Sequence, residues 1–307
     1  MKHLLCLNDW TSEEILAVLD LADKLKYENK NKIAHDHHLK GKTLGMIFSK
    51  SSTRTRVSFE VGMHQLGGYA LFLSSSDIQI GRGETVHDTA KTLSRYLDGI
   101  MIRTFMQKDV EDLAVYGNIP IINGLTDELH PCQILADLMT IREKKGTLKG
   151  LKVCYVGDGN NIAHSLLIGC AKTQTNISIA TPKEYLCMQK YIDIAMGIAS
   201  ETGSNIEILT DPKQAIKDAD VVYTDTWASM GMEDEKEQRA IIFAPYQVNE
   251  ELFSLEKQNA IFMHCLPAYR GFEVDKAIID GPNSVVFDEA ENRLHAQKAV
   301  MVKLLSD

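Results

Sequence analysis

The chain has 307 residues, of which 44% are hydrophobic and 24% charged, as expected for a globular protein with two domains of ordinary size. Its net charge of −9 excludes a broad basic surface, so neither nucleic acid nor an anionic membrane is expected as a partner. The six cysteines include no C-x-x-C pair, which indicates buried thiols rather than a disulfide framework or a metal site. With no apparent signal peptide or bilayer-length apolar run, we expect a cytoplasmic protein that acts on a small anionic substrate.

The predicted elements begin with a helix at about residues 10–30, after which short apolar runs alternate with helical patterns. The predicted strands of a first series are Thr43–Phe48, Tyr69–Leu73, Gly99–Ile102 and Pro120–Ile122. Those of a second series are Lys152–Val156, Ile177–Ala180, Glu207–Leu209, Val221–Tyr223, Ala260–His264 and Val285–Phe287. This alternation predicts an α/β protein with parallel sheets built from right-handed βαβ units.

A weak internal repeat separates the two series, since Leu39–Thr43 and Leu148–Lys152 each carry a Leu-Lys-Gly motif before a strand. We therefore expect two similar α/β domains, residues 1–138 and 139–291. A connecting helix is expected at Ala136–Lys145, and a last helix at about 292–307 should pack back on the first domain. The charged stretch Met232–Arg239 predicts a loop. Ligands of parallel sheets bind beyond the carboxyl ends of the strands, so the active site is expected in the cleft between the domains.

A candidate anion site follows the first predicted strand, where the sequence reads Ser52-Thr53-Arg54-Thr55-Arg56 before a helical segment. Free N–H groups, the positive end of the helix dipole, hydroxyls and a guanidinium would meet there, which suits a phosphate-like dianion. Because Arg54 and Arg56 point to different sides of a helix, Arg54 is expected to face the ligand and Arg56 to form ion pairs. The sequence lacks a Walker motif, so the anion need not be a nucleotide.

Polar residues also follow other predicted strands. Arg103 ends the third strand, His130 and Gln133 lie in a His-Pro-Cys-Gln motif after the fourth, Asp225 follows Val221–Tyr223, and His264-Cys265 end a later strand. His130 could donate a hydrogen bond to a carbonyl oxygen of the substrate, and the Gln133 amide oxygen could accept one from a substrate N–H.

Two alternative interpretations are disfavoured. The turn Gly157-Asp158-Gly159-Asn160-Asn161 lacks the third glycine of a dinucleotide motif, and the next strand ends in Thr181 rather than an acid, so Asn160 or Asn161 better suits a substrate carboxylate. A Cys265–His264 nucleophile pair is disfavoured because adjacent residues of a strand point to opposite faces.

Five motifs occur in an order that resembles the aspartate/ornithine carbamoyltransferase family over essentially the whole chain. Two of them resemble motifs of the members that use ornithine. These are Ser229-Met230-Gly231, within Asp225–Gly231, and the His-Cys-Leu-Pro motif at 264–267. The others are the motif at 52–56, His130-Pro131-Cys132-Gln133 and Glu291-Asn292-Arg293. The resemblance implies transfer of the carbamoyl group of carbamoyl phosphate to the side-chain amine of L-ornithine, giving L-citrulline and phosphate, with no cofactor and no metal.

The resemblance also implies the site residues. Those expected to bind carbamoyl phosphate are Ser52, Thr53, Arg54, Thr55, Gln79, Arg103, His130, Gln133, Cys265, Leu266 and Arg293. Those expected to bind ornithine are Asn161, Asp225, Ser229 and Met230. Catalytic roles are implied for Arg103, His130, Cys265, Asp225 and Arg293. The family further implies a homotrimer, or a multiple of trimers, in which Gln79 reaches a neighbouring subunit's site, and a cis Leu266–Pro267 bond.

Three other functions remain as alternatives. A carbamoyltransferase for a diamine such as putrescine would not need the Ser229-Met230-Gly231 motif, because a diamine has no α-carboxylate. A nicotinamide-dependent dehydrogenase is disfavoured by the missing glycine. A phosphate-binding module without catalysis is disfavoured by the presence of Arg54, Arg103, His130 and Arg293 together.

Overall fold

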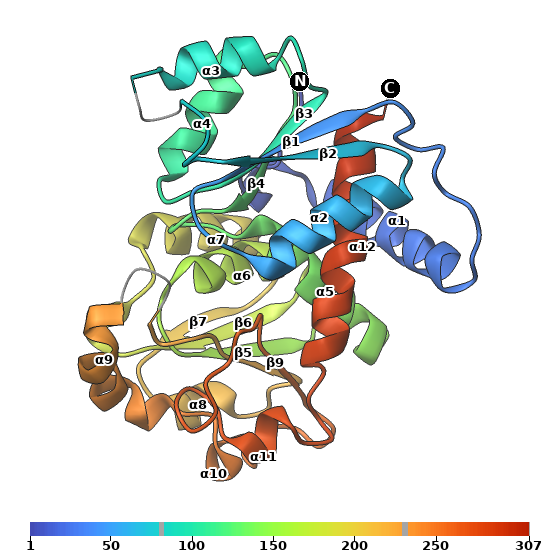
Figure 1. The fold of residues 1–307 in the computed structure, drawn as a ribbon. Helices are drawn as coiled ribbons and strands as arrows, with labels where there is room; N and C mark the ends of the chain where they lie inside the picture. Colours follow the sequence, from blue (N-terminus) through green and yellow to red (C-terminus); the bar gives the residue numbers. More distant parts are fainter. Residues whose placement is uncertain (80–82, 229–232, 307) are drawn as a thin grey trace. The chain divides into compact units, whose positions relative to one another are not determined.

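The computed structural model describes residues 1–79, 83–228 and 233–306, which form two compact units. One unit comprises Met1–Met139 with Glu291–Asp307, and the other comprises Thr140–Ala290. Each contains a parallel β-sheet flanked by helices, so the predicted α/β fold class is confirmed (Figure 1).

The first unit is built on a four-stranded sheet in the order β2-β1-β3-β4, with all strand pairs parallel. Its strands are β1 (Thr43–Phe48), β2 (Tyr69–Ser74), β3 (Gly99–Arg103) and β4 (Ile121–Leu125). Its helices are η1 (Leu7–Asp9), α1 (Ser12–Lys30), α2 (Thr53–Gln65), α3 (Val86–Leu93) and α4 (Gln107–Tyr116). Two further helices, α5 (Pro131–Lys145) and α12 (Val286–Leu305), each contain a boundary between the units.

Apolar residues of the strands pack against the helices on one face of this sheet. Ile47, Ile100 and Ile121 belong to a core shared with Val110 and Leu113 of α4. Figure 1 shows α3 and α4 on one side of the sheet and α2 and α12 on the other. Helices α2 and α12 pack closely. A Cβ at Gly62 of α2 would lie 2.8 Å from Met301 and 3.2 Å from Lys298 of α12.

The second unit has a five-stranded parallel sheet in the order β7-β6-β5-β8-β9. Its strands are β5 (Lys152–Val156), β6 (Asn176–Ala180), β7 (Ile206–Leu209), β8 (Val221–Tyr223) and β9 (Ile261–Met263). Its helices are α6 (Asn161–Lys172), η2 (Lys183–Tyr185), α7 (Gln189–Thr202), α8 (Pro212–Ile216), η3 (Glu233–Glu235), α9 (Lys236–Phe243), η4 (Ala244–Tyr246), α10 (Glu250–Phe253) and α11 (Lys276–Ile279). Within this unit, α6 and α7 lie on one side of the sheet and α8, α10 and α11 on the other (Figure 1).

Two predictions of local structure are wrong. The predicted strand Val285–Phe287 does not form. Val285 makes one backbone hydrogen bond to Phe262, and α12 then begins at Val286. The described part of the predicted loop Met232–Arg239 is helical, in η3 and α9, where Arg239 bonds Glu235 one turn earlier.

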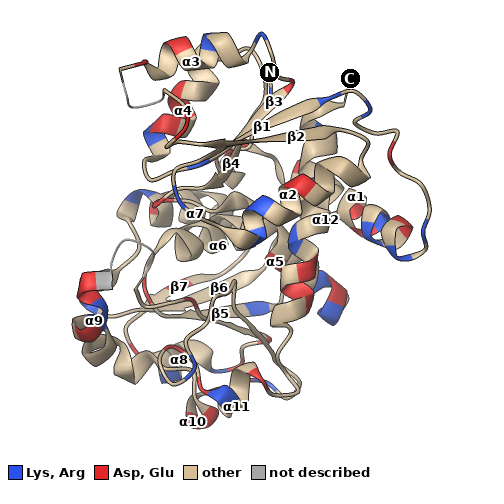
Figure 2. Ribbon diagram, in the orientation of Figure 1, with Lys and Arg blue, Asp and Glu red and all other residues tan. Residues whose placement is uncertain are grey.

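Charge is distributed along the helices rather than gathered. Figure 2 shows acidic and basic residues interspersed on α1 and α9, so these helices present mixed charge. None of the helices in the described residues has the length and the apolar character needed to cross a bilayer.

Candidate functional site

The predicted anion-binding residues of the first unit lie where its strand order reverses. The chain passes from β1 outward to β2 and then returns to β3 on the other side of β1. At such a reversal the two following loops diverge and leave room for a ligand beyond the carboxyl ends of the strands. The loop after β1 carries the motif 52–56, and β3 ends at Arg103.

Ser52 caps the N-terminus of α2. Its backbone is extended, with φ −164° and ψ 116°, and its hydroxyl accepts a 3.2 Å hydrogen bond from the Thr55 N–H. Thr53 is exposed and Arg54 half-buried, whereas Thr55 is buried. The helix therefore begins with one N–H capped and with hydroxyl and guanidinium groups beside the remaining donors, an arrangement suited to an anion.

Arg56 does what its position in the helix predicts. It is exposed, donates a 3.1 Å hydrogen bond to Glu60 one turn later, and lies 3.8 Å from the centre of the Phe72 ring. The prediction of a structural ion pair is confirmed.

His130 is a buried neutral imidazole surrounded by cations. It immediately precedes α5 and is 5% exposed. Burial, followed by the charges of Arg293, Arg103 and Arg54, holds the His130 pKa well below its ordinary value of 6.5. Four residues from four separate chain segments therefore form one electropositive cluster in which the imidazole stays uncharged.

Arg293 connects this cluster to the neighbouring helices. Its guanidinium donates a 2.5 Å hydrogen bond to the Gln133 side-chain oxygen and a 3.3 Å bond to the Thr55 hydroxyl. The Gln133 amide nitrogen in turn donates to Asp137 at 2.8 Å, which fixes the amide orientation. Arg293, Gln133 and Thr55 are all buried, so the bonds form away from water, where they are strongest.

The second unit repeats the topological arrangement. Its strand order reverses between β5 and β8, and a hydrogen bond joins the segments that follow these two strands. The Asn160 side-chain nitrogen donates to the Asp225 carboxylate at 2.9 Å, while the Asn160 oxygen caps α6 by accepting from the N–H groups of Ile162 and Ala163. Asn161 is the first residue of α6 and half-buried. Of the two asparagines, Asn160 has a structural role.

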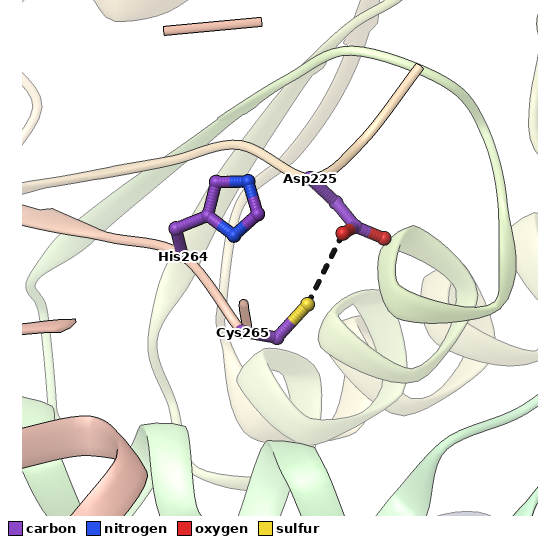
Figure 3. A group of neighbouring side chains, drawn as sticks. All are labelled: Asp225, His264 and Cys265. Carbon is purple, nitrogen blue, oxygen red and sulfur yellow. Dashed lines mark hydrogen bonds between the residues drawn. The ribbon is translucent and has the colours of Figure 1, made fainter. Parts of the chain in front are cut away.

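Asp225 and Cys265 are in direct contact. The Cys265 thiol donates a 3.1 Å hydrogen bond to the Asp225 carboxylate (Figure 3). This carboxylate also accepts from the Thr226 N–H at 2.8 Å. Asp225 is buried, and Cys265 is half-buried.

His264 lies beside these two residues (Figure 3), and one potential ligand atom of each residue lies within 4.8 Å of the others. Both ring nitrogens of His264 already have partners, however. One accepts from the Leu266 N–H at 2.9 Å, and the other lies 3.2 Å from Glu273. The arrangement fits a hydrogen-bonded support for the His-Cys-Leu-Pro turn better than it fits a metal centre. The Leu266–Pro267 bond in this turn is cis, as predicted.

The turn after β5 is closed by backbone. A Cβ at Gly159 would lie 2.4 Å from both the Tyr185 carbonyl oxygen and the Cys187 nitrogen, and the Gly159 N–H bonds the Tyr185 carbonyl. The chain itself fills the approach to this glycine, which disfavours the dinucleotide interpretation.

Sequence reasoning missed a buried ion pair in the second unit. Arg239 donates at 2.8 Å to Asp158 and at 2.8 Å to the Trp227 carbonyl oxygen. Burial raises the Asp158 pKa to about 6, against the opposing effect of Arg239. No local pattern reveals this pair, because its residues lie 81 positions apart.

Three other predicted site residues show no contact with a ligand-binding group in the described structure. Gln79 is exposed in the loop after β2. Ser229 and Met230 lie outside the described residues, so their predicted contacts stay predictions.

Comparisons with known proteins agree along the chain. Residues 2–143 match the family model of the aspartate/ornithine carbamoyltransferase carbamoyl-P binding domain, and residues 149–304 match that of the Asp/Orn binding domain. The chain is 59% identical over 302 residues to an ornithine carbamoyltransferase of Caldicellulosiruptor saccharolyticus, covering 98% of both chains. It is 58% identical to that of Bacillus subtilis, covering 99% of this chain and 94% of the relative.

The solved structure of the ornithine carbamoyltransferase from Pyrococcus furiosus is similar as well. It superposes with a TM-score of 0.96 at 57% identity, covering 99% of this chain and 97% of the other. With both family models matched and relatives this similar over nearly the full length, the chain belongs to the aspartate/ornithine carbamoyltransferase family.

Proposed function

We propose that this protein is an ornithine carbamoyltransferase, which transfers the carbamoyl group of carbamoyl phosphate to the side-chain amine of L-ornithine and releases L-citrulline and phosphate. The observation that carries the proposal is the cluster at the start of α2, where Arg54, Arg103 and Arg293 surround a neutral His130. A doubly charged phosphate and an adjacent carbonyl require such a site. Citrulline formation places the enzyme in arginine metabolism.

Carbamoyl phosphate is assigned to the first unit. The phosphate accepts hydrogen bonds from the start of α2 and from Ser52, Thr53 and Arg54, with Arg103 adding positive charge, while the Thr55 hydroxyl serves the carbonyl end of carbamoyl phosphate. Gln133 and Arg293, already joined by a 2.5 Å bond, orient the carbamoyl group. Gln79, Cys265 and Leu266 are further proposed contacts.

His130 serves as a hydrogen-bond donor rather than an acid. Because its pKa is held well below 6.5, the imidazole is neutral at physiological pH and donates to the carbonyl oxygen without carrying a positive charge of its own. Arg103 and the Thr55 hydroxyl complete the stabilisation of the negative oxygen that develops when the amine attacks.

Ornithine is assigned to the second unit. The Asp225 carboxylate, held by Asn160 and Thr226, suits the α-ammonium group, and Asn161 suits the α-carboxylate. Ser229 and Met230 are proposed to bind the same carboxylate. Cys265, bonded to Asp225, lies near the reacting amine in this proposal.

The attacking amine must lose a proton. Its pKa in water is similar to that of lysine, about 10.4. Desolvation lowers this value, because it penalises the charged form. The departing phosphate accepts the proton released during the reaction, so the proposal requires no dedicated protein base and no metal or cofactor.

A trimer, or a multiple of trimers, is the proposed assembly. Four large apolar side chains on α2 and β2 are exposed in the single chain: Val57, Val61, Tyr69 and Leu71, at 51%, 37%, 63% and 37%. An apolar surface of this kind supports a subunit contact. The loop that follows β2 carries Gln79, which would then reach a neighbouring subunit. A cytoplasmic location likewise stays a prediction.

An assay of carbamoyl transfer to a panel of amines tests the function. Ornithine should be carbamoylated far faster than putrescine, which lacks the carboxylate, and faster than Nα-acetylornithine, whose α-nitrogen cannot pair with Asp225. Equal rates with ornithine and putrescine would favour a diamine enzyme, and no turnover with any amine would contradict the proposal.

A further inference from the structure

A buried glutamine connects the two helices that carry arginines of the proposed carbamoyl phosphate site. Gln297 is fully buried on α12, four residues after Arg293. Ser58 occupies the corresponding place on α2, four residues after Arg54. In each helix this spacing places the second residue one turn beyond the arginine.

The amide of Gln297 satisfies its two neighbours in only one of its two orientations. Its oxygen then accepts from Arg293 at 3.2 Å from Nε and 2.8 Å from one Nη, and its nitrogen donates to the Ser58 hydroxyl at 2.5 Å. The reverse orientation would aim amide N–H groups at a guanidinium, which has no acceptor.

The proton on Ser58 reinforces this assignment. The Ser58 hydroxyl donates a 2.6 Å hydrogen bond to the Arg54 carbonyl oxygen. Its only proton is therefore used, and the hydroxyl must accept from Gln297. A continuous chain of hydrogen bonds results, from the Arg293 guanidinium through Gln297 and Ser58 to the backbone of Arg54.

We propose that Gln297 is a positioning residue that holds the Arg293 guanidinium in register with the anion-binding start of α2. Arg293 also bonds Gln133 and Thr55, so three fixed acceptors on three elements determine where its charge points. The inference rests on the proposed function, because carbamoyl phosphate is taken to be the ligand that Arg293 and the start of α2 bind together. Of the three acceptors, only Gln297 is not itself a proposed ligand contact.

A substitution at Gln297 can remove its hydrogen bonds to Arg293 and Ser58 while keeping the packing of the side chain. Gln297→Met keeps the length of the side chain and removes its two hydrogen bonds with Arg293 and its one with Ser58. Because hydrogen bonds to a charged guanidinium are lost, we expect the KM for carbamoyl phosphate to rise about tenfold to a hundredfold. The KM for ornithine at saturating carbamoyl phosphate should stay unchanged.

Lys298→Met is the matched control. Lys298 is the next residue of α12, equally buried, and bonds Gln65 at 2.9 Å and His35 at 2.8 Å instead of Arg293. It should leave both KM values unchanged. A KM for carbamoyl phosphate that is normal in Gln297→Met, or raised equally in both variants, would overturn the inference.

A second variant and a binding measurement complete the test. If Gln297→Met does not fold, Ser58→Ala decides, since it removes the acceptor of the amide nitrogen; a raised KM for carbamoyl phosphate supports the inference and an unchanged one overturns it. Calorimetric titration with a phosphonate analogue of carbamoyl phosphate should show the same weakening in the absence of turnover. An inactive wild-type enzyme would instead refute the proposed function.

Discussion

Arg293 and Gln133 share a 2.5 Å hydrogen bond between Nη1 and Oε1, although they are 160 positions apart in the chain. The bond joins α12 to α5, and Asp137 fixes the other end of the Gln133 amide. Arg293 thus belongs with Arg54, Arg103 and His130 in one electropositive cluster assembled from distant segments.

The first prediction concerns the arginine at the start of α2. Arg54→Ala removes a charged hydrogen bond to the phosphate, which is worth about 2–3 kcal/mol, so kcat/KM for carbamoyl phosphate should fall about 30-fold to 150-fold. Arg54→Lys should recover only part of the lost kcat/KM, because an ammonium cannot form the forked contact. Arg56→Ala, two residues away and exposed, is the control and should leave kcat/KM for carbamoyl phosphate unchanged. Similar losses in both alanine variants would refute the separate roles.

The second prediction concerns the charge of His130. Its pKa lies well below 6.5 because of burial and three nearby guanidinium groups, so the imidazole should remain neutral from pH 8 to pH 6.5. Carbon NMR of ring-labelled protein, with the signal assigned by a His130→Asn variant, measures this directly. The unfolded chain binds a proton at His130 more readily than the folded one, so this residue makes stability fall as the pH drops below about 6.5. An imidazolium signal at pH 7 would contradict the proposed role as a neutral donor.

The third prediction concerns Lys298, which is buried and has a pKa lowered to about 8 by desolvation. Between pH 8 and 10.5 the unfolded chain keeps a proton that the folded protein has lost, so this lysine makes stability rise with pH. At pH 7, Lys298→Met should be at least as stable as the wild type. Its relative stability should then fall by on the order of 3 kcal/mol on going to pH 10.5.

Urea unfolding of both proteins at fixed protein concentration measures this difference. If the two free energies of unfolding differ by the same amount at every pH, the charged state of Lys298 is not what limits stability.

The fourth prediction concerns Gln79 and the proposed trimer. Gln79→Ala and Arg54→Ala should each have low activity, yet trimers reassembled from a mixture should recover activity. In such trimers, a site that has Arg54 from its own subunit can receive Gln79 from a neighbour. Mass measurement confirms reassembly. Confirmed mixed trimers with only parental activity would refute a shared site.

Local chemistry explains which parts of the fold and site could be predicted. The segment 52–56 combines a Ser cap, hydroxyls and arginines at a strand–helix junction, and the structure places Ser52 at the cap of α2. Short β-branched and apolar runs gave the strands correctly except at Val285–Phe287. There, only Val285 bonds Phe262, and α12 begins at the next residue, which the local composition does not reveal.

The remaining site features depend on tertiary contacts. Gln297 lies outside the Glu291-Asn292-Arg293 motif, and its role becomes visible only from its contacts with Arg293 and with Ser58 of α2. Asn160 and Asn161 are chemically identical, and they are told apart by the bond from Asn160 to Asp225 and by the cap that Asn160 forms on α6.

The central claim is carbamoyl transfer to ornithine, and one labelling measurement tests it most directly. Carbamoyl phosphate carrying ¹³C at the carbonyl and ¹⁸O at the bridging oxygen is incubated with enzyme and L-ornithine and followed by ¹³C and ³¹P NMR. Attack of the amine on the carbonyl carbon forms the C–N bond and breaks the C–O bond. All enzyme-dependent ¹³C should therefore appear in the ureido carbon of citrulline, and the ¹⁸O should appear in an equal amount of inorganic phosphate. Enzyme-dependent ¹³C in bicarbonate alone, or ¹⁸O retained on the carbon fragment, would contradict it.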